Sequence, residues 1–244
     1  MTGRSPFDSR DVLSRRGGPV KQPLSRDLIV TEALAQLTRE GLEGMSLRKV
    51  AAALETGPAS LYAYVDDLQA LQALVLDRAL AAVDVSGGRR RGWRERVKAV
   101  LDSYVRVLLA SPGLAQLAMS PIAVGPRALR ILETLLGLLE EGGLTQTSAA
   151  WAVDLLMLYG TAIGVEQSNG HNPSDPESPS ARALSGAPAE EYPRLHAAAE
   201  ELLAGDGEAR FSWAIDVLIT GVLQSPAPKW VGKRVVKAKP KPSR

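Results

Sequence analysis

Hydrophobic residues recur along this chain at intervals of three and four, the spacing that places them on one face of an α-helix. In residues 24–40, one such stripe consists of Leu28, Ile29, Ala33 and Leu37. No run of alternating Val, Ile and Thr is bounded by hairpin turns, so strands are not expected. The pattern therefore predicts an all-α fold.

The other segments with helical spacing are separated by turn-forming residues. They cover residues 47–54, 58–64, 68–83, 93–110, 114–119, 126–141, 147–168, 189–203 and 208–224. Residues 169–188 are rich in Asn, Gly, Pro, Ser and Asp, and we expect them to form a mobile loop. Gly87 and Gly88 interrupt the pattern and predict a domain boundary there.

These interruptions divide the chain into four predicted parts. Residues 1–23 form a flexible basic N-terminal arm, 24–86 a first helical domain, 87–224 a larger helical domain and 225–244 a basic tail. The first 22 residues are polar and lack the apolar core of a signal peptide, so we expect a cytoplasmic protein.

The net charge of +2 hides an uneven distribution of charge. The last 20 residues carry seven Lys and Arg and no Asp or Glu, and the first 23 carry five basic and two acidic residues. Residues 24–224 therefore carry a net charge of −8. Basic tails are typical of proteins that contact nucleic acid, although a solvated tail without a partner is an equally good interpretation.

Several classes of protein are disfavoured by what the chain lacks. It has no cysteine, which excludes disulfides, thiolate zinc sites and a cysteine nucleophile. Its two histidines, His171 and His196, are far apart in sequence, so we expect no metal site and no cofactor. The longest apolar run, 149–165, is interrupted by Asp154 and is short for a membrane span. No enzyme motif is present, so catalysis is not expected.

The stretch TGPASLYAYV, residues 56–65, follows a short helix and a turn. A short helix is unstable alone and must be held by packing, and Leu61 and Val65 supply an apolar face. Ser60, Tyr62 and Tyr64 are then expected to point outward. A short docked helix with exposed hydroxyls is typical of a helix-turn-helix that binds a DNA groove, where hydroxyls donate to phosphate.

Pro58 and Ala59 begin this second helix and would approach base edges. Both are able to contact a thymine methyl group, but neither makes a bidentate hydrogen bond. The alternative is an ordinary helical hairpin with exposed tyrosines, and the local pattern alone does not separate the two.

The segment GLEGMSLRKVAAALETGPASLYAYVDDLQALQALVLDRAL, residues 41–80, resembles the DNA-binding domain of the tetracycline-repressor (TetR) family. The similarity lies in Gly41 and Gly44, in SLRKVA (46–51) and in LYAYV (61–65). Later residues resemble the same family more weakly: Trp93, Pro126 and FSWAIDVLITGVL (211–223). The resemblance implies an N-terminal three-helix DNA-binding domain and a larger helical domain for ligand binding and dimerisation.

The resemblance assigns DNA contacts by position. It implies that Arg48 contacts DNA, that Pro58, Ala59, Ser60 and Tyr62 enter the major groove, and that Tyr64 meets a backbone phosphate.

The chain departs from the family in one respect that bears on DNA binding. Leu68 stands where the family often has a lysine that binds phosphate, and residues 24–66 carry a net charge of −2. We therefore expect the N-terminal arm, through Arg15, Arg16 and Lys21, to supply positive charge along the DNA.

A dimer is expected because one short helix covers only a few base pairs. Two stripes at helical spacing are candidates for its interface. They are Val153, Met157, Gly160 and Gly164, and Phe211, Ile215, Leu218 and Val222. The alternative is that both stripes pack inside one subunit, since a stripe indicates burial and not the partner.

The resemblance also implies a small-molecule pocket in the larger domain. Its candidate lining residues are Tyr104, Leu108, Leu135, Leu139, Trp151, Leu155 and Tyr159. For each of them, a place in the ordinary core is the alternative. The family's magnesium–drug site uses a histidine, and no histidine precedes residue 171, so that metal site is not expected in this chain. By analogy with the family, the resemblance implies a flat aromatic or polyketide-like effector.

These expectations combine into a homodimeric repressor that a small molecule releases from its operator. Ligand binding would move the helix at 68–83, which joins the pocket to the DNA-binding helices. Two alternatives remain open: an activator with the same fold, and a helical small-molecule-binding protein with weak or altered DNA binding.

Overall fold

The computed structural model describes residues 5–8, 23–88, 92–122, 124–168, 175 and 177–228. Within these ranges the regular structure is helical and contains no strand, which confirms the predicted fold class. The helices are α1 (Arg26–Gly44), α2 (Leu47–Ala53), α3 (Pro58–Leu61), α4 (Leu68–Leu80), α5 (Trp93–Leu109), α6 (Leu114–Met119), α7 (Pro126–Glu141), α8 (Gln146–Ser168), α9 (Pro179–Ser185), α10 (Pro193–Ala197), α11 (Ala199–Leu203) and α12 (Gly207–Gln224). The predicted arm residues Arg15, Arg16 and Lys21, and tail residues 229–244, lie outside the described residues.

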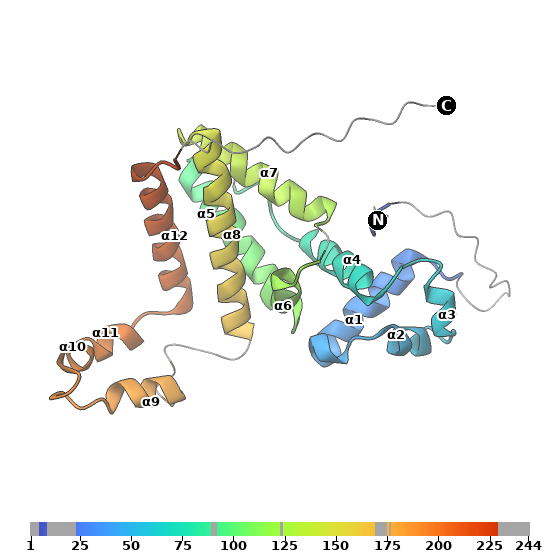
Figure 1. Cartoon of the computed structure of the whole chain (residues 1–244), viewed down its shortest axis with the longest axis horizontal. Coiled ribbons are helices and arrows are strands. Elements are labelled where there is room, and N and C mark those ends of the chain that lie inside the picture. Colours follow the sequence, from blue (N-terminus) through green and yellow to red (C-terminus); the bar gives the residue numbers. More distant parts are fainter. Residues whose placement is uncertain are drawn as a thin grey trace.

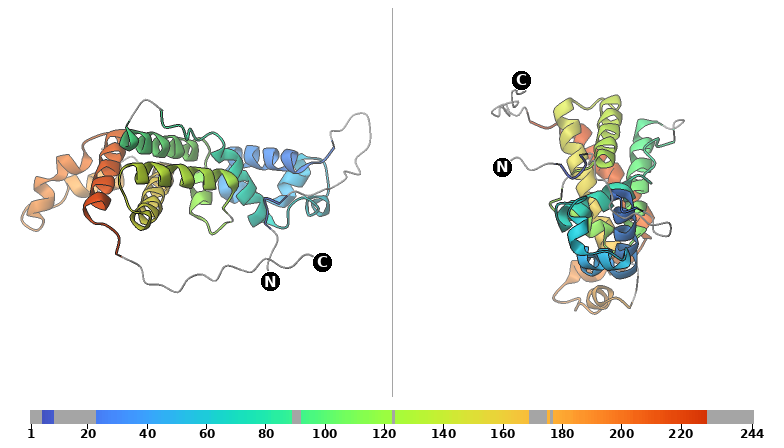
Figure 2. Two further views of the ribbon diagram at one scale, coloured as in Figure 1. Left: turned by 90° about the horizontal axis from the view of Figure 1, so that it is seen from above. Right: turned by 90° about the vertical axis from the view of Figure 1, so that its right-hand side faces the viewer.

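The helices form three groups along the molecule (Figure 1). We call α1–α3 the head, α5–α8 together with α12 the body, and α9–α11 the outer unit. The molecule is elongated, with the head at one end and the outer unit at the other (Figure 2). Helix α8 packs against α5, α6, α7 and α12 in the body, and α4 contacts both the head and the body.

Polar side chains at the helix starts explain where α1, α2 and α4 begin. Ser25, Ser46 and Asp67 each accept a hydrogen bond from a backbone N–H in the first turn of the following helix. Such caps satisfy donors that have no partner inside the helix. At Gly41 the backbone has a φ of 69°, which glycine adopts readily, and α1 kinks there before it continues to Gly44.

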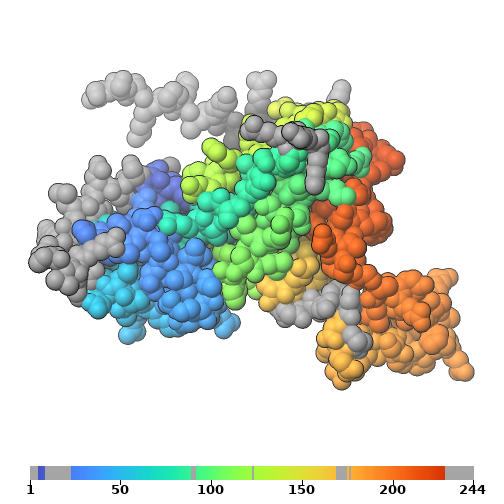
Figure 3. Space-filling model, turned by 180° about the vertical axis from the view of Figure 1, so that it is seen from behind, coloured from blue at the N-terminus to red at the C-terminus, as the bar shows by residue number. Residues whose placement is uncertain are grey.

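Two predicted segments differ from the structure. Part of the expected loop at 169–188 is helix α9, because Ser178 caps it and Pro179 occupies its first position, where a proline is well tolerated. Residues 189–203 form the two short helices α10 and α11 instead of one helix. A proline occupies the first position of α9 and of α10, whereas the sequence pattern alone favoured a loop or a continuous helix. Figure 3 shows the outer unit protruding from the body.

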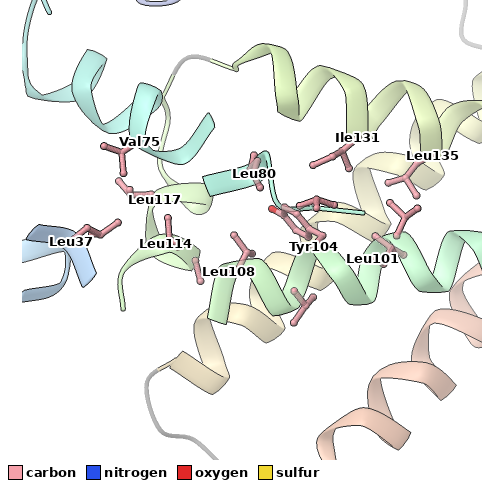
Figure 4. Packing of buried hydrophobic residues seen from close by; sticks show 14 of the residues in the cluster. Leu37, Val75, Leu80, Leu101, Tyr104, Leu108, Leu114, Leu117, Ile131 and Leu135 are labelled. Carbon is pink, nitrogen blue, oxygen red and sulfur yellow. The ribbon is translucent and has the colours of Figure 1, made fainter. Parts of the chain in front are cut away.

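The head and the body are joined by buried apolar packing. Leu37 of α1, Val75 of α4 and Leu114 and Leu117 of α6 meet at this joint, and all four are buried (Figure 4). Gly113 precedes α6 with a φ of 90°, and a Cβ there would lie 2.8 Å from the backbone nitrogen of Leu42. The approach of α6 to α1 therefore depends on a glycine at this position.

Helix α8 is long and apolar enough to pass a test for membrane spans based on length and composition. In this fold 44% of its most apolar window is buried inside the molecule. A central helix of a helical domain meets the same test, so its apolar character is accounted for by its place in the body.

We expect Leu117→Ala to lower the free energy of unfolding by about 2–5 kcal/mol, because it leaves a cavity at the joint between head and body. Leu129→Ala removes the same atoms from a side chain that is 56% exposed and should change stability by less than about 0.5 kcal/mol. Denaturant unfolding of both variants measures the difference, and equal losses would contradict the described packing.

Candidate nucleic-acid interface and ligand cavity

The segment from α2 to α3 forms a helix, a turn and a second helix. Glu55 lies in the turn with a φ of 49°, and Thr56 donates its backbone N–H to the carbonyl of Ala51 at 2.9 Å. Pro58 occupies the first position of α3. Helix α3 is a single turn, shorter than the two turns predicted, and its attachment depends on Leu61, which is fully buried.

Most of the residues of this motif that were predicted to contact DNA are exposed. Arg48 is exposed in α2, and Pro58, Ala59, Ser60 and Tyr62 are exposed in and just after α3. Tyr62 is 54% exposed despite its size. Five of the six residues predicted to contact DNA are therefore accessible and close in the chain, and their contact with DNA stays a prediction.

Tyr64 does not belong to this surface, and the prediction that it points outward is wrong. Its side chain is 6% exposed, and its hydroxyl donates a hydrogen bond of 2.8 Å to the carbonyl of Leu24. The physical reason is that α3 ends at Leu61, so helical spacing no longer determines the direction of a side chain three residues later. Tyr64 instead fastens the start of the head to the turn after α3.

The basic residues of the head are largely paired with acids. Lys49 lies 2.5 Å from Glu40, and Arg39 lies 3.0 Å from Glu32. The hydrogen bond from Lys49 lowers the pKa of Glu40 below its usual value. Among the described residues Arg48 has no ion-pair partner, which leaves it as the available cation beside α3.

Sequence inspection missed Gln36, which orients the motif from α1. Its side chain is 2% exposed, and its Oε1 accepts a hydrogen bond of 3.2 Å from the backbone N–H of Ser46, the residue that caps α2. A polar residue inside the apolar stripe of α1 was the available signal, since buried polar side chains are normally hydrogen-bonded.

A cavity of about 210 Å³ lies between α4 and the body. Its lining residues are mostly apolar and come from α4, α5, α6, α7, α8 and the segment before α7. They are Ala73, Leu76, Asp77, Leu80, Tyr104, Ala118, Ser120, Ile122, Val124, Gly125, Ala128, Ile131, Leu132 and Met157. An apolar cavity with a few polar groups is the usual form of a small-molecule site.

Tyr104 supplies one polar group of this cavity, as predicted, although its contact with a ligand stays a prediction. Thr161 donates its hydroxyl hydrogen to the carbonyl of Met157 at 2.8 Å, so Tyr104 is the donor in its own 2.8 Å bond to Thr161. Burial raises the pKa of the Tyr104 hydroxyl. Figure 4 shows this ring between Leu80 and Ile131.

The other predicted lining residues lie outside the cavity. Leu108, Leu135 and Leu139 are fully buried in the core, where neighbouring side chains fill the space around them. Tyr159 stacks on Phe211 of α12, with ring centroids 5.9 Å apart.

The placement of Trp151 and Leu155 in the pocket is wrong. They are 51% and 40% exposed, and neither of them lines the cavity. They line a surface groove beside the end of α12 instead.

Asp77 is a further polar group of the cavity that sequence inspection missed. It is 8% exposed, and its Oδ1 accepts a 2.8 Å hydrogen bond from the backbone N–H of Arg127 in α7. The signal was weak, because an acid on an amphipathic helix normally faces solvent.

The predicted interface stripes are largely buried within the subunit, as the alternative interpretation held. Val153, Gly160, Gly164, Phe211 and Ile215 all face the body. For these five residues the assignment to a dimer interface is wrong, because they are buried within one chain. Met157, Leu218 and Val222 are half-buried, and their contact with a second subunit stays a prediction.

A different apolar stripe on the same two helices is exposed. It consists of Trp151, Leu155 and Leu158 of α8 and of Trp213 and Val217 of α12, and Trp213 is 69% exposed. We call these five residues the exposed α8–α12 face. So large an apolar area on a surface commonly marks a protein–protein interface.

No group of three or more His, Asp or Glu residues among the described residues is arranged to hold a metal ion. His196 lies in α10 of the outer unit, far from the cavity along the chain. Within this part of the chain, the chemistry that the site offers is hydrogen bonding and apolar contact.

Comparison with known proteins gives consistent matches. The family described as Tetracyclin repressor-like, C-terminal domain, matches residues 88–225. The HTH-type transcriptional repressor DrrR1 of Streptomyces coeruleorubidus is 35% identical over 155 residues, which are 62% of this chain and 55% of that protein. The chain thus spans about half the length of the curated relatives it matches.

Solved structures match over more of their length. A transcription regulator from Streptomyces coelicolor is 39% identical, with 85% of this chain and 98% of that chain covered and a TM-score of 0.70. Apo ActR from Streptomyces coelicolor is 35% identical, with 84% and 97% covered and a TM-score of 0.74. ActR has also been solved in complex with actinorhodin and with (S)-DNPA.

Tyr64→Phe should lower the free energy of unfolding by about 0.5–1.5 kcal/mol, because the buried carbonyl of Leu24 loses its donor. Tyr62→Phe removes the same atom from an exposed side chain and should leave stability within about 0.5 kcal/mol of the original. Denaturant unfolding distinguishes them. A loss for Tyr62→Phe and none for Tyr64→Phe would reverse the assignment of the two tyrosines.

Proposed function

The chain belongs to the tetracycline-repressor (TetR) family of transcriptional regulators, and on this premise we propose that it is a homodimeric, cytoplasmic repressor. A small molecule that occupies the cavity releases it from operator DNA. The observation that carries the proposal is the position of α4, which contacts α1 in the head and also lines the cavity. The proposed role is regulatory and includes no catalytic step, metal or cofactor.

The head is proposed to bind the major groove of double-stranded DNA through α3. Pro58, Ala59, Ser60 and Tyr62 approach the groove, and Arg48 contacts a phosphate, as their exposure allows. Since these side chains make few hydrogen bonds to bases, two heads spaced by about 34–36 Å are needed for a specific site.

Two-fold pairing through the exposed α8–α12 face supplies the second head. Trp213 and Val217 of α12 and Trp151 and Leu155 of α8 form an apolar surface that a second copy would cover. A two-fold axis places the same patch on both subunits, so a four-helix interface follows from two helices per chain.

The effector is proposed to be a largely apolar, aromatic or polyketide-like molecule. Apolar lining with the Tyr104 hydroxyl and the Asp77 carboxylate fits such a compound. The relative ActR, solved with actinorhodin, supports this class. A drug-sized ligand usually occupies a pocket of about 300–1,000 Å³, and the cavity measures about 210 Å³, so we propose that admitting such a ligand requires its walls to move.

We propose that this movement of the cavity walls releases the protein from operator DNA. Helix α4 is one of the walls, and any displacement of α4 changes the position of the head. Ligand binds the displaced state better than the DNA-competent state, and this difference in affinity shifts the equilibrium.

A second candidate is a helical small-molecule-binding protein with weak or altered DNA binding. The net charge of −2 over residues 24–66 and the pairing of Lys49 with Glu40 favour it. In the preferred proposal the N-terminal arm, through Arg15, Arg16 and Lys21, offsets this deficit. Activation in place of repression is compatible with the same fold.

We expect the protein to retard DNA that flanks its own gene in a gel-shift titration, with an affinity that falls as salt rises. Tyr62→Ala should weaken binding at least about tenfold, or about 1.4 kcal/mol. Arg48→Ala should weaken binding to all sequences and reduce the salt slope by about 1.

The matched controls are Tyr192→Ala and Arg130→Ala, which change exposed residues distant from the head in sequence. Both should bind as the original protein does. Binding that none of the four variants alters would contradict the assigned surface, and absence of binding to any genomic fragment would favour the second candidate.

Val217→Glu should convert the dimer into monomers, because it places a charge within the exposed α8–α12 face. Leu129→Glu makes the same change at an exposed position of α7 and should leave the dimer intact. Sedimentation velocity measures both. A Val217→Glu dimer of unchanged affinity would contradict the proposed interface.

A further inference from the structure

Two adjacent residues of α4 bind opposite parts of the molecule. Asp77 accepts a hydrogen bond from α7 in the body, whereas Arg78 donates to Thr31 of α1 in the head at 3.1 Å and pairs with Asp27 of the same helix. Two consecutive residues of α4 therefore attach it to the body and to the head.

The contact of Asp77 with α7 replaces the cap that α7 lacks. Gly125, the residue before α7, has no side chain to cap it, and Pro126 has no N–H. The N–H of Arg127 is the first backbone donor of the helix, and it donates a hydrogen bond of 2.8 Å to Asp77 Oδ1. The guanidinium of Arg127 also lies 3.5 Å from Asp77 Oδ2. A carboxylate at this end of a helix also interacts favourably with the helix dipole.

The close fit of these groups is visible at Gly125. A Cβ at that position would lie 2.1 Å from Asp77 Oδ1, so any larger residue would displace the carboxylate. Gly125 has a φ of −90°, which every residue adopts. Glycine is needed here because of Asp77 and not because of the backbone.

The same carboxylate is part of the cavity wall. Asp77 and Gly125 both line the cavity, and Asp77 is the acidic residue among its lining side chains. An ionised carboxylate accepts about four hydrogen bonds, and the described contacts of Asp77 are the two with Arg127. A ligand hydroxyl in the cavity would therefore find an acceptor at the point where α4 is fastened to α7.

We propose that Asp77 is the positioning residue that couples the cavity to the head: it fastens α4 to the start of α7 in the DNA-competent state, and a ligand that donates a hydrogen bond to it loosens that attachment. Arg78, paired with Asp27, transmits the displacement of α4 to α1. The inference rests on the proposed function and specifies how its two sites communicate.

Coupling is reciprocal, so the inference can be tested with DNA alone and without an effector. DNA is expected to favour the state in which Asp77 holds the start of α7. If so, DNA must also protect the backbone N–H of Arg127, which donates to Asp77, from hydrogen exchange. We expect DNA to slow amide hydrogen exchange in residues 125–132 about fivefold, the lower end of typical coupling. The probe is a genomic fragment selected by the full-length protein, and exchange is followed by mass spectrometry.

Three variants separate coupling from a purely structural cap. In Asp77→Ala, exchange at 125–132 should be faster, and DNA should no longer slow it. Gly125→Ala should act similarly, since its Cβ displaces the carboxylate while Asp77 itself remains. Asp77→Asn retains an acceptor for Arg127 and should restore the slowing by DNA. Glu133→Gln, an exposed acid of α7, is the matched control and should behave as the original protein.

Two results would overturn the inference. One is an original protein that binds DNA tightly while exchange at 125–132 does not change. The other is slowing by DNA that persists undiminished in Asp77→Ala and Gly125→Ala. If the original protein binds no genomic fragment, the proposed function fails first, and the inference fails with it.

Discussion

The arrangement of the molecule depends on one constraint: α4 must bury side chains against two partners at once. Leu71, Val75 and Leu80 are buried along a helix of 13 residues, which contacts α1 on one side and α5, α6 and α7 on the other. A helix packed on both sides cannot shift relative to one partner without strain against the other, because cores are close-packed. The cavity lies against the same helix, and the proposed coupling between body and head rests on this position.

The sequence predicted most of the fold because helical periodicity and capping are local properties. Ser46 and Asp67 cap the helices that follow them in sequence, and Leu61 is buried as its spacing required. Predictions about side-chain direction were less secure where a helix was short. Tyr64 was expected on the surface and is buried, because α3 stops after one turn and tertiary packing then decides the direction of each side chain.

The cavity and the exposed apolar face were harder to predict, for a physical reason. Periodicity shows that a side of a helix is apolar, but it does not show which neighbour covers that side. Trp151 was expected in the pocket and is half exposed outside it, whereas Tyr104 lines the cavity and its contact with a ligand stays a prediction. Asp77 gave almost no signal and Gln36 gave only its position in an apolar stripe, because the hydrogen-bond partner of each lies elsewhere in the sequence.

The central claim is that cavity and head share one conformational equilibrium through α4. It is tested most directly by titrating actinorhodin into the free protein and into the protein saturated with its selected DNA fragment, and by measuring DNA affinity with and without the compound. We expect the compound to bind the DNA-saturated protein more weakly than the free protein. DNA should bind the compound-saturated protein more weakly than the free protein, and by the same factor. Actinorhodin that binds the free protein and leaves DNA affinity unchanged would contradict it.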